Sequence, residues 1–443
     1  MYTIAIDCGT SFLKAALLES ESGQILEQRT VSTALQQENV KFPKIHGVIK
    51  AVEELLKVFR KYGTEFLVGI STEMHGFILT DDQDQILCDY VSWKDEWALQ
   101  QKKEGSYLDE IASLIGIEMF RTTGMSLKPG IASTNLYVLL DREPQMRQKK
   151  IRFFTLGDYL IYHLTGCIPV MHPTNAAASG LYDLEQHCWH KQLIRELGYD
   201  FIQFPEVGED NCVDMMWEGY HYWFCEAIGD QQAALLGSGL ARSDEISFNL
   251  GTGSQVSVLS DKLAFHKAYQ TRPFFHGKYL NTIPHVPCGR ALNVYVHFFM
   301  DILERYTGEK IDEKRLWTTL LESVEQSSDT ELEIDMSFFA NSVTGQVRGG
   351  IYGISEDNLY MGNLMRAVFE QMAQNYYDVT KKLLNNTKQL HTVIFSGGVA
   401  CKNSFLREKI MSRFEGCEMK LASDETFYGL WKYVKEVYDG RLR

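Results

Sequence analysis

The beginning of the chain alternates apolar and polar side chains in short runs and also places apolar side chains at helical spacing. Residues 2–6, 14–18 and 66–70 have the composition and alternation of β-strands. Residues 48–62 carry apolar side chains three or four positions apart, which predicts an amphipathic helix. We therefore expect the N-terminal part to mix helices and strands.

A second set of elements begins past the middle of the chain, after Gly237-Ser238-Gly239. The expected order there is two strands, a long helix, a strand and a helix, at residues 246–250, 255–259, 363–384, 391–395 and 403–414. Because the two halves resemble each other, and because 443 residues exceed the usual size of one core, we predict two domains. Their expected bounds are residues 1–240 and 241–443.

A short turn rich in glycine and hydroxyl side chains separates the strands of each predicted pair. The first turn reads Asp7-Cys8-Gly9-Thr10-Ser11, and the second reads Asn249-Leu250-Gly251-Thr252-Gly253-Ser254. Glycine lets a backbone approach an anion closely, and hydroxyl and N–H groups coordinate phosphate oxygens. The two turns predict a nucleotide held between the domains, with phosphate contacts from Thr10, Ser11, Thr252 and Gly253.

Each of these turns leads into a strand, so each predicts a β-hairpin, whereas a P-loop leads from a strand into a helix. A Walker-type fold is therefore disfavoured. Lys14 lies in the first returning strand. Its position leaves two readings open, a contact with phosphate or a solvated strand edge.

Composition and charge narrow the class of protein. The formal charge of -14 is spread along the chain, and no basic helix-turn-helix region is visible, so we expect no nucleic-acid partner. No apolar run is long enough to span a bilayer, and the first residues do not resemble a secretion leader. The nine cysteines include no Cys-x-x-Cys pair, which favours reduced thiols. We therefore expect a cytoplasmic protein with no membrane partner.

Several segments match one known family in the order in which that family presents them. They are Glu73-Met74-His75-Gly76, Trp93-Lys94-Asp95, Asp158-Tyr159-Leu160, Gly229-Asp230-Gln231-Gln232 and Ser396-Gly397-Gly398-Val399. With the two turns, they resemble the FGGY family of carbohydrate kinases over nearly the whole chain. The resemblance implies an α/β fold with two actin-like (ribonuclease H-like) ATPase domains around a central cleft. Residues 269–293 most resemble the sedoheptulokinase branch of that family.

The resemblance also implies a role for individual residues. It implies that Asp230 is the general base and that Asp7 holds Mg²⁺ through water. Sugar contacts are expected from His75, Trp93, Asp95 and Gln231. Contacts with the nucleoside of ATP are expected from Gly397, Gly398 and Asn403. The implied reaction is phosphorylation of a sugar by Mg-ATP at a primary hydroxyl, and we favour a ketose such as sedoheptulose or xylulose.

Asp230 is expected to begin a helix, where the helix dipole would favour its ionised form. We therefore predict a low pKa for Asp230, with orientation and late proton acceptance as its contribution. Domain closure around both substrates would exclude water. Taken alone, Asp230 also fits a helix cap. A non-catalytic sugar or nucleotide sensor on the same fold stays an alternative, and a chaperone-like or filament-forming ATPase is a further one.

The chain departs from the family pattern at several positions. Glu73 stands where the family commonly has glutamine, and Trp97 where it has arginine. Bulky side chains fill Asp424-Glu425-Thr426-Phe427-Tyr428-Gly429, where relatives often have alanines. The choice of sugar and the preference for ATP are therefore open at this stage, as is the oligomeric state, for which a homodimer is one option.

Overall fold

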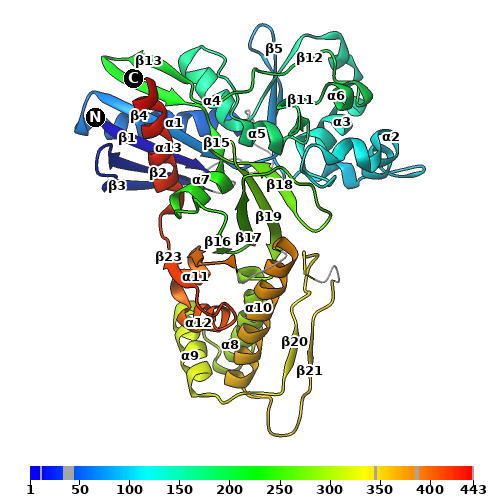
Figure 1. Ribbon diagram of the computed structural model, residues 1–443, viewed down its shortest axis with the longest axis vertical. Coiled ribbons are helices and arrows are strands. Elements are labelled where there is room, and N and C mark those ends of the chain that lie inside the picture. Colours follow the sequence, from blue (N-terminus) through cyan, green and yellow to red (C-terminus); the bar gives the residue numbers. More distant parts are fainter. Residues whose placement is uncertain (10–11, 33–43, 344–346, 385–388, 442–443) are drawn as a thin grey trace.

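The computed structural model describes residues 1–9, 12–32, 44–343, 347–384 and 389–441, without the side chain of Ile117. Its N-terminal sheet has the strand order β13-β14-β4-β1-β2-β3, and the short β15 also pairs with β4 (Figure 1). β1 is antiparallel to β2 and parallel to β4, which confirms the first predicted hairpin. The strands of this sheet are β1 (Tyr2–Cys8), β2 (Phe12–Glu19), β3 (Ile25–Ser32), β4 (Glu65–Thr72), β13 (Cys212–Trp217), β14 (Tyr220–Cys225) and β15 (Ile228–Gly229).

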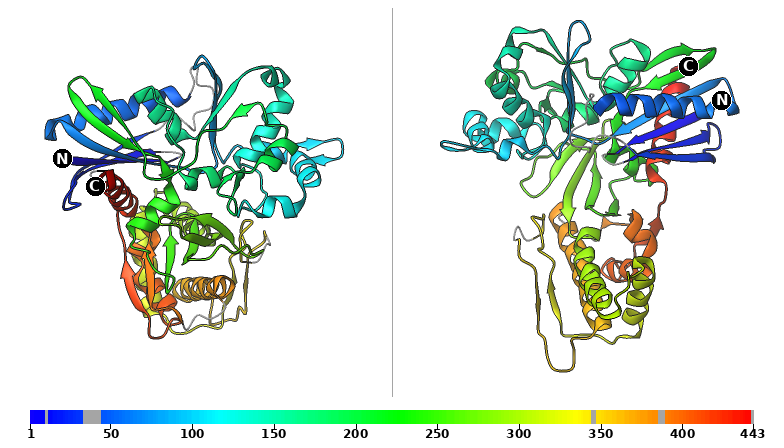
Figure 2. Two further views of the ribbon diagram at one scale, coloured as in Figure 1. Left: turned by 45° about the horizontal axis from the view of Figure 1, so that its top comes forward. Right: turned by 180° about the vertical axis from the view of Figure 1, so that it is seen from behind.

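Helix α1 (Lys44–Phe59) crosses the N-terminal sheet, as the view from behind in Figure 2 shows. The predicted helical spacing is confirmed, and a 3-10 turn at Arg60–Tyr62 continues it. The helix buries its apolar side against one face of β1, in a core that contains Ile4 and Ile6. Ala5 points to the opposite face, because successive side chains of a strand alternate. Both faces of the sheet are therefore covered.

A further sheet lies beside the first, with the order β12-β9-β5-β6. Its strands are β5 (Phe77–Asp81), β6 (Ile86–Val91), β9 (Ile151–Phe154) and β12 (Ile202–Gln203). The helices around it are α2 (Tyr107–Arg121), α3 (Ala132–Arg142), α4 (Leu156–Thr165), α5 (Pro173–Ala178) and α6 (Lys191–Glu196). Short pairs are formed by β7 (Gln101–Lys102) with β8 (Gly105–Ser106), and β10 (Tyr182–Asp183) with β11 (Cys188–Trp189). Short 3-10 turns lie at Trp97–Leu99 and Pro144–Gln148.

The C-terminal sheet has the order β18-β19-β17-β16-β22-β23. β16 and β17 are antiparallel, which confirms the second predicted hairpin. The strands are β16 (Glu245–Leu250), β17 (Ser254–Ser260), β18 (Gln270–Pro273), β19 (Tyr279–Val286), β22 (Thr392–Ser396) and β23 (Glu418–Leu421). The helices are α8 (Gly289–Thr307), α9 (Glu313–Gln326), α10 (Met361–Leu383), α11 (Gly398–Lys402) and α12 (Ser404–Met411). The pair β20 (Glu333–Asp335) and β21 (Gly350–Tyr352) forms the yellow arm in Figure 1.

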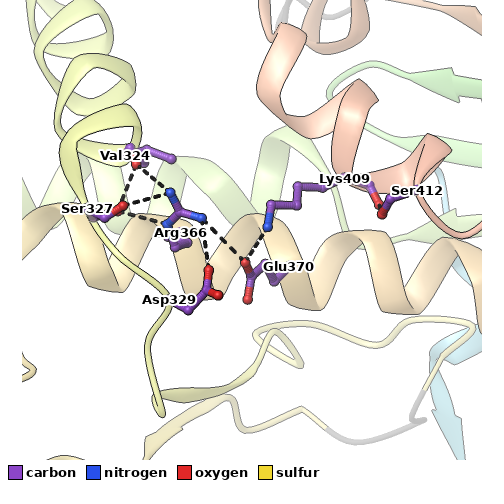
Figure 3. A network of polar contacts seen from close by, with 7 residues as sticks. All are labelled: Val324, Ser327, Asp329, Arg366, Glu370, Lys409 and Ser412. Carbon is purple, nitrogen blue, oxygen red and sulfur yellow. Dashed lines mark hydrogen bonds and ion pairs between the residues drawn. The ribbon is translucent and has the colours of Figure 1, made fainter.

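A half-buried arginine joins helices of this part, as Figure 3 shows. Arg366 on α10 donates from Nε to Ser327 Oγ at 2.9 Å, and from Nη2 to the carbonyl oxygens of Ser327 at 2.8 Å and Val324 at 3.2 Å. These carbonyls end α9, where backbone acceptors lack partners within the helix. Glu370 then accepts a 2.7 Å bond from Lys409 of α12. The network ties α9, α10 and α12 together.

The last helix, α13 (Glu425–Arg441), returns to the N-terminal sheet and packs beside α7 (Asp230–Gly237). Figure 1 shows α13 in red beside the blue strands. The two helices touch through glycines: a Cβ atom on Gly429 would lie 1.8 Å from the carbonyl oxygen of Ala233, and one on Gly237 would lie 1.7 Å from that of Glu425. The crossing therefore fixes the position of α7, whose first residue is Asp230.

Candidate active site

A cavity of about 510 Å³ lies where the N-terminal sheets meet the C-terminal sheet. It contains several of the predicted site residues, supplied by segments that are far apart in the sequence. They are Asp7, His75, Trp93, Asp230 and Gln231. Other groups on its wall were not predicted as site residues: Glu73, Glu96, Lys128, Arg272, His285, Glu425 and Thr426.

The second hairpin turn and the third glycine turn lie against each other. Gly251 donates its N–H to the carbonyl oxygen of Gly253 at 3.2 Å, and this closes a turn in which Thr252 and Gly253 are exposed. Gly397 has a φ of 87°, and a Cβ there would lie 2.7 Å from the carbonyl carbon and oxygen of Leu250. Only glycine fits this approach. The turn predicted for phosphate thus touches the turn predicted for adenosine. Thr10 and Ser11, the predicted phosphate contacts of the first hairpin, lie outside the described residues.

Asp7 lies near the end of β1, and its Oδ1 accepts a 3.0 Å hydrogen bond from the hydroxyl of Ser71 on β4. Burial raises its pKa, while that hydrogen bond and the charge of Lys14 oppose the rise. Lys14 is the cross-strand partner of Asp7 in the hairpin, is exposed, and does not line the cavity. Its ammonium group therefore acts on Asp7 through charge.

Asp230 is the first residue of α7, and its Oδ1 accepts a 2.7 Å bond from the N–H of Gln231. The predicted low pKa is wrong, because burial and the charges of Asp7 and Glu73 raise the pKa of Asp230 to about 7. The N–H bond and Arg272 lower it by less. A single amide and a helix dipole do not compensate for desolvation beside two carboxylates.

His75 lines the cavity with an unusual backbone conformation, because its φ is 78°. Its Nδ1 lies 2.7 Å from the carbonyl oxygen of Ala178, which can only accept a hydrogen bond. Nδ1 therefore carries the proton, and Nε2 keeps its lone pair. Burial, Lys128 and Arg272 hold the pKa of His75 well below its usual value, so the ring is neutral.

Gln231 lines the cavity but uses its side chain inside the protein. Its Nε2 donates to the hydroxyl of Thr282 at 3.0 Å, and its Oε1 accepts from Arg272 Nη1 at 2.5 Å. Arg272 also donates from Nη2 to Gln270 Oε1 at 2.7 Å. Gln231 thus fixes the guanidinium at the cavity wall.

The remaining predicted residues lie at the edge of the cavity or away from it. Trp93 is 39% exposed and lines the rim. Asp95 closes the turn before it, because its Oδ2 accepts a 2.7 Å bond from the N–H of Ser92, and it does not line the cavity. Asn403 is buried and caps α12 through a 2.9 Å bond from the N–H of Leu406. Gly398 begins α11, next to open space.

Among the groups that were not predicted, Glu73 accepts hydrogen bonds from the hydroxyls of Tyr90 at 2.6 Å and Ser92 at 2.9 Å. The sequence marked it only as a departure from the family pattern. Arg272 offered a usable signal, because a charged residue inside a strand of the core is uncommon. Lys128 offered none, since it stands in a loop between helices.

A pair of hairpins with a nucleotide-sized cavity between them is the arrangement of actin-like ATPases, a class with several chemistries. Residues 2–237 match the N-terminal domain of the FGGY family of carbohydrate kinases, which is more than half of the chain. The chain therefore belongs to the FGGY family of carbohydrate kinases, as its motifs indicated. It is an enzyme that phosphorylates a sugar with ATP.

Three comparisons show how far the likeness extends. The chain is 21% identical to the sedoheptulokinase of Mus musculus, with 93% of this chain and 92% of that protein covered. It is 21% identical to the xylulose kinase of Staphylococcus xylosus, over 92% of this chain and 84% of that protein. The crystal structure of gluconate kinase from Lactobacillus acidophilus matches with a TM-score of 0.83, 20% identity, and coverage of 99% and 89%. The predicted two-domain actin-like α/β fold is thus confirmed.

Within the described ranges, no helix combines the length and the apolarity needed to cross a membrane. All cysteines of the chain lie in those ranges and are free thiols.

Proposed function

We propose that this kinase transfers the γ-phosphoryl group of Mg-ATP to a primary hydroxyl of a ketose or a closely related sugar. The observation that carries the proposal is the meeting of Asp7 and Asp230 in one cavity with Glu73, Met74 and His75 of the family segment Glu73 to Gly76. The names of the sedoheptulokinase and xylulose kinase relatives support a ketose.

Asp230 is proposed as the general base. A base is most effective when its pKa lies near the working pH, and the pKa of Asp230 is raised to about 7. Its Oδ1 is occupied by the Gln231 N–H, so Oδ2 is the atom proposed to take the proton from the sugar hydroxyl. His75 would accept a hydrogen bond from another hydroxyl at Nε2, and the ring of Trp93 would lie against the carbon chain.

Asp7 is proposed to hold Mg²⁺ through water. Magnesium keeps several waters and takes one or two protein carboxylates, together with the phosphates of the nucleotide. The donor fits, because Asp7 is a carboxylate at the cavity wall whose raised pKa a cation would lower. When bound, the ion would neutralise charge on the phosphates.

Gly397, Gly398, Thr252 and Gly253 are proposed to border the nucleotide, with Lys14 acting through its charge. For two residues that were expected to contact a ligand we propose an indirect role. Asp95 would shape the turn that carries Trp93, and Asn403 would support the adenosine turn through α12. We further propose a division near Leu240 with closure around both substrates. In this division α13 would belong to the C-terminal part by sequence but pack on the N-terminal side of the cleft.

A cytoplasmic location is proposed from the free thiols, and a homodimer is proposed as an option for the assembly. The sensor alternative requires a site without turnover, and the retained carboxylates Asp7 and Asp230 argue against it.

The test is a coupled ADP-release assay with Mg-ATP over a panel of ketoses, polyols and aldoses. Asp230→Asn should lower kcat by at least about 10²-fold while changing the binding of sugar much less. Asp301→Asn is the matched control, because Asp301 is an exposed surface carboxylate. ADP release that no sugar stimulates would refute the proposal in favour of an ATPase, and nucleotide binding without turnover would favour a sensor.

A further inference from the structure

The sugar side of the cavity carries a group of basic side chains. Arg272 of β18, Lys128 of the loop before α3, His75 and His285 all line it. Burial lowers the pKa of each of the two histidines, and the charges of both Lys128 and Arg272 lower it further. The neutral histidines leave Lys128 and Arg272 as the charges there.

Arg272 is nearly buried, with 6% of its surface exposed. Its guanidinium contacts Gln231, Gln270 and the sulfur of Met74, which lies 3.5 Å from Nη1. In the described part of the chain its Nε has no hydrogen-bond partner, and it forms no ion pair with a carboxylate. A buried cation normally has an anionic partner, because removal from water is costly.

Lys128 completes the group. In the described ranges its ammonium group forms neither an ion pair nor a hydrogen bond that would fix it in place. Burial and the charge of Arg272 lower the pKa of Lys128 to about 8, and Glu96, an exposed residue at the rim, opposes this. Because a neighbouring cation weakens the charged form of Lys128, a further negative charge at this wall would stabilise that form.

The carboxylates of the cavity have other neighbours. Glu73 is held by Tyr90 and Ser92, and Asp7 and Glu425 are coupled by charge on the side of the first hairpin. Asp230 acts on Arg272 only through charge, since no direct hydrogen bond joins them among the described contacts. Among the described contacts, no carboxylate of the cavity is hydrogen-bonded or ion-paired to Arg272 or Lys128.

We propose that the acceptor sugar carries an anionic group, a carboxylate or a phosphate ester, bound between Arg272 and Lys128. The inference rests on the proposed function and narrows it, because a keto sugar acid or an aldonate still offers a primary hydroxyl to Asp230. A guanidinium recognises either anion through paired N–H donors, and an ammonium adds a point charge. A neutral sugar would leave both cations without a directly bonded anionic partner among the described residues.

The test compares each of two anionic substrates with its neutral counterpart. D-gluconate and D-glucitol share their chain and differ at C1, while D-fructose 6-phosphate and D-fructose form the phosphate pair. In the wild-type enzyme we expect kcat/KM to favour at least one anion over its neutral partner by tenfold or more. A preference in the first pair identifies a carboxylate, and one in the second identifies a phosphate ester.

Lys128→Met keeps the length of the side chain and removes the charge, and it should reduce that preference about tenfold, mainly through KM. Lys103→Met is the matched control, because Lys103 is exposed and outside the cavity, and it should leave the preference unchanged. Arg272→Lys should retain part of the preference, since it keeps a cation at the wall. Efficient turnover of neutral sugars only, or an unchanged preference in Lys128→Met, would overturn the inference while the kinase proposal stands.

Calorimetry with D-gluconate or D-fructose 6-phosphate, without nucleotide, separates the two proposals. If no sugar stimulates ADP release but an anion binds and Lys128→Met weakens that binding, the proposed function fails and the anion site stands. If neither anion binds and neither is turned over, the anion site is refuted.

Discussion

The contact between α7 and α13 makes Gly429→Ala a sharp test of how the catalytic helix is positioned. A Cβ at residue 429 would lie 1.8 Å from the carbonyl oxygen of Ala233, whereas real Cβ atoms essentially never approach closer than 3.0 Å. The two helices must then separate by about 1.2 Å, because backbone atoms on both sides leave no flexible side chain to yield. Overpacking of this kind costs ~1–3 kcal/mol.

The displacement should lower the rate of phosphoryl transfer as well as the stability of the fold. Ala233 lies one helical turn after Asp230, and a misplacement of about 1 Å in a reacting group can cost about 10²-fold in rate. We therefore expect Gly429→Ala to lower both the melting temperature and kcat. Thermal denaturation and steady-state kinetics on the same preparation measure the two effects.

Gly440→Ala is the matched control within the same helix, because a Cβ there meets no atom within 4 Å. It should keep kcat and leave stability equal or slightly higher, since alanine favours helix over glycine. If Gly429→Ala melted within about 1 °C of the wild type and kept kcat within about twofold, the reasoning from the crossing would be refuted.

Three further predictions follow from buried polar groups. Because burial and nearby carboxylates raise the pKa of Asp230 to about 7, kcat/KM for the sugar should fall about tenfold per pH unit below that value, and a flat profile from pH 5 to 8 would contradict its role. Burial also raises the pKa of Asp158 to about 7, so the folded state holds a proton that the unfolded chain releases near its ordinary value of 3.8. The free energy of unfolding should therefore decline as pH rises between these values, by at most ~4 kcal/mol, and urea titrations of Asp158→Asn should lose that slope. Arg366→Met should cost ~1–3 kcal/mol in denaturant unfolding, because the carbonyls at the end of α9 lose their donor, whereas Arg315→Met on the exposed side of α9 should cost little.

The local elements could be predicted because their signals are local. Alternation over a few residues and a short turn define each hairpin, and the spacing of residues 48–62 defines most of α1. The sheet that pairs β5 with β9 could not be predicted, because α2 and α3 lie between these two strands in the sequence. The return of α13 to the first sheet was equally hidden, because it depends on glycine contacts between distant segments.

The candidate site was likewise predictable only in part. Asp7, His75 and Asp230 could be placed together because each stands in a recognisable segment of the family. Arg272 stands in the segment 269–293 that resembles the sedoheptulokinase branch, whereas Lys128 stands in no such segment, and only the folded chain brings the two to one wall. The direction of the pKa shift of Asp230 was predicted wrongly, because the pKa depends on burial and on carboxylates from β1 and from the loop after β4 more than on its own helix.

The return of α13 has a consequence for synthesis on the ribosome. The face of the first sheet that includes Ala5 and Leu67 packs with Leu430 and Val434, so this part of its cover is translated long after the strands themselves. During elongation the apolar side chains of that face stay exposed, so that chaperones can bind them or they can drive aggregation. Completion of this core is thus deferred until α13 has been translated, and a chain that stopped before α13 would leave that face of the sheet exposed.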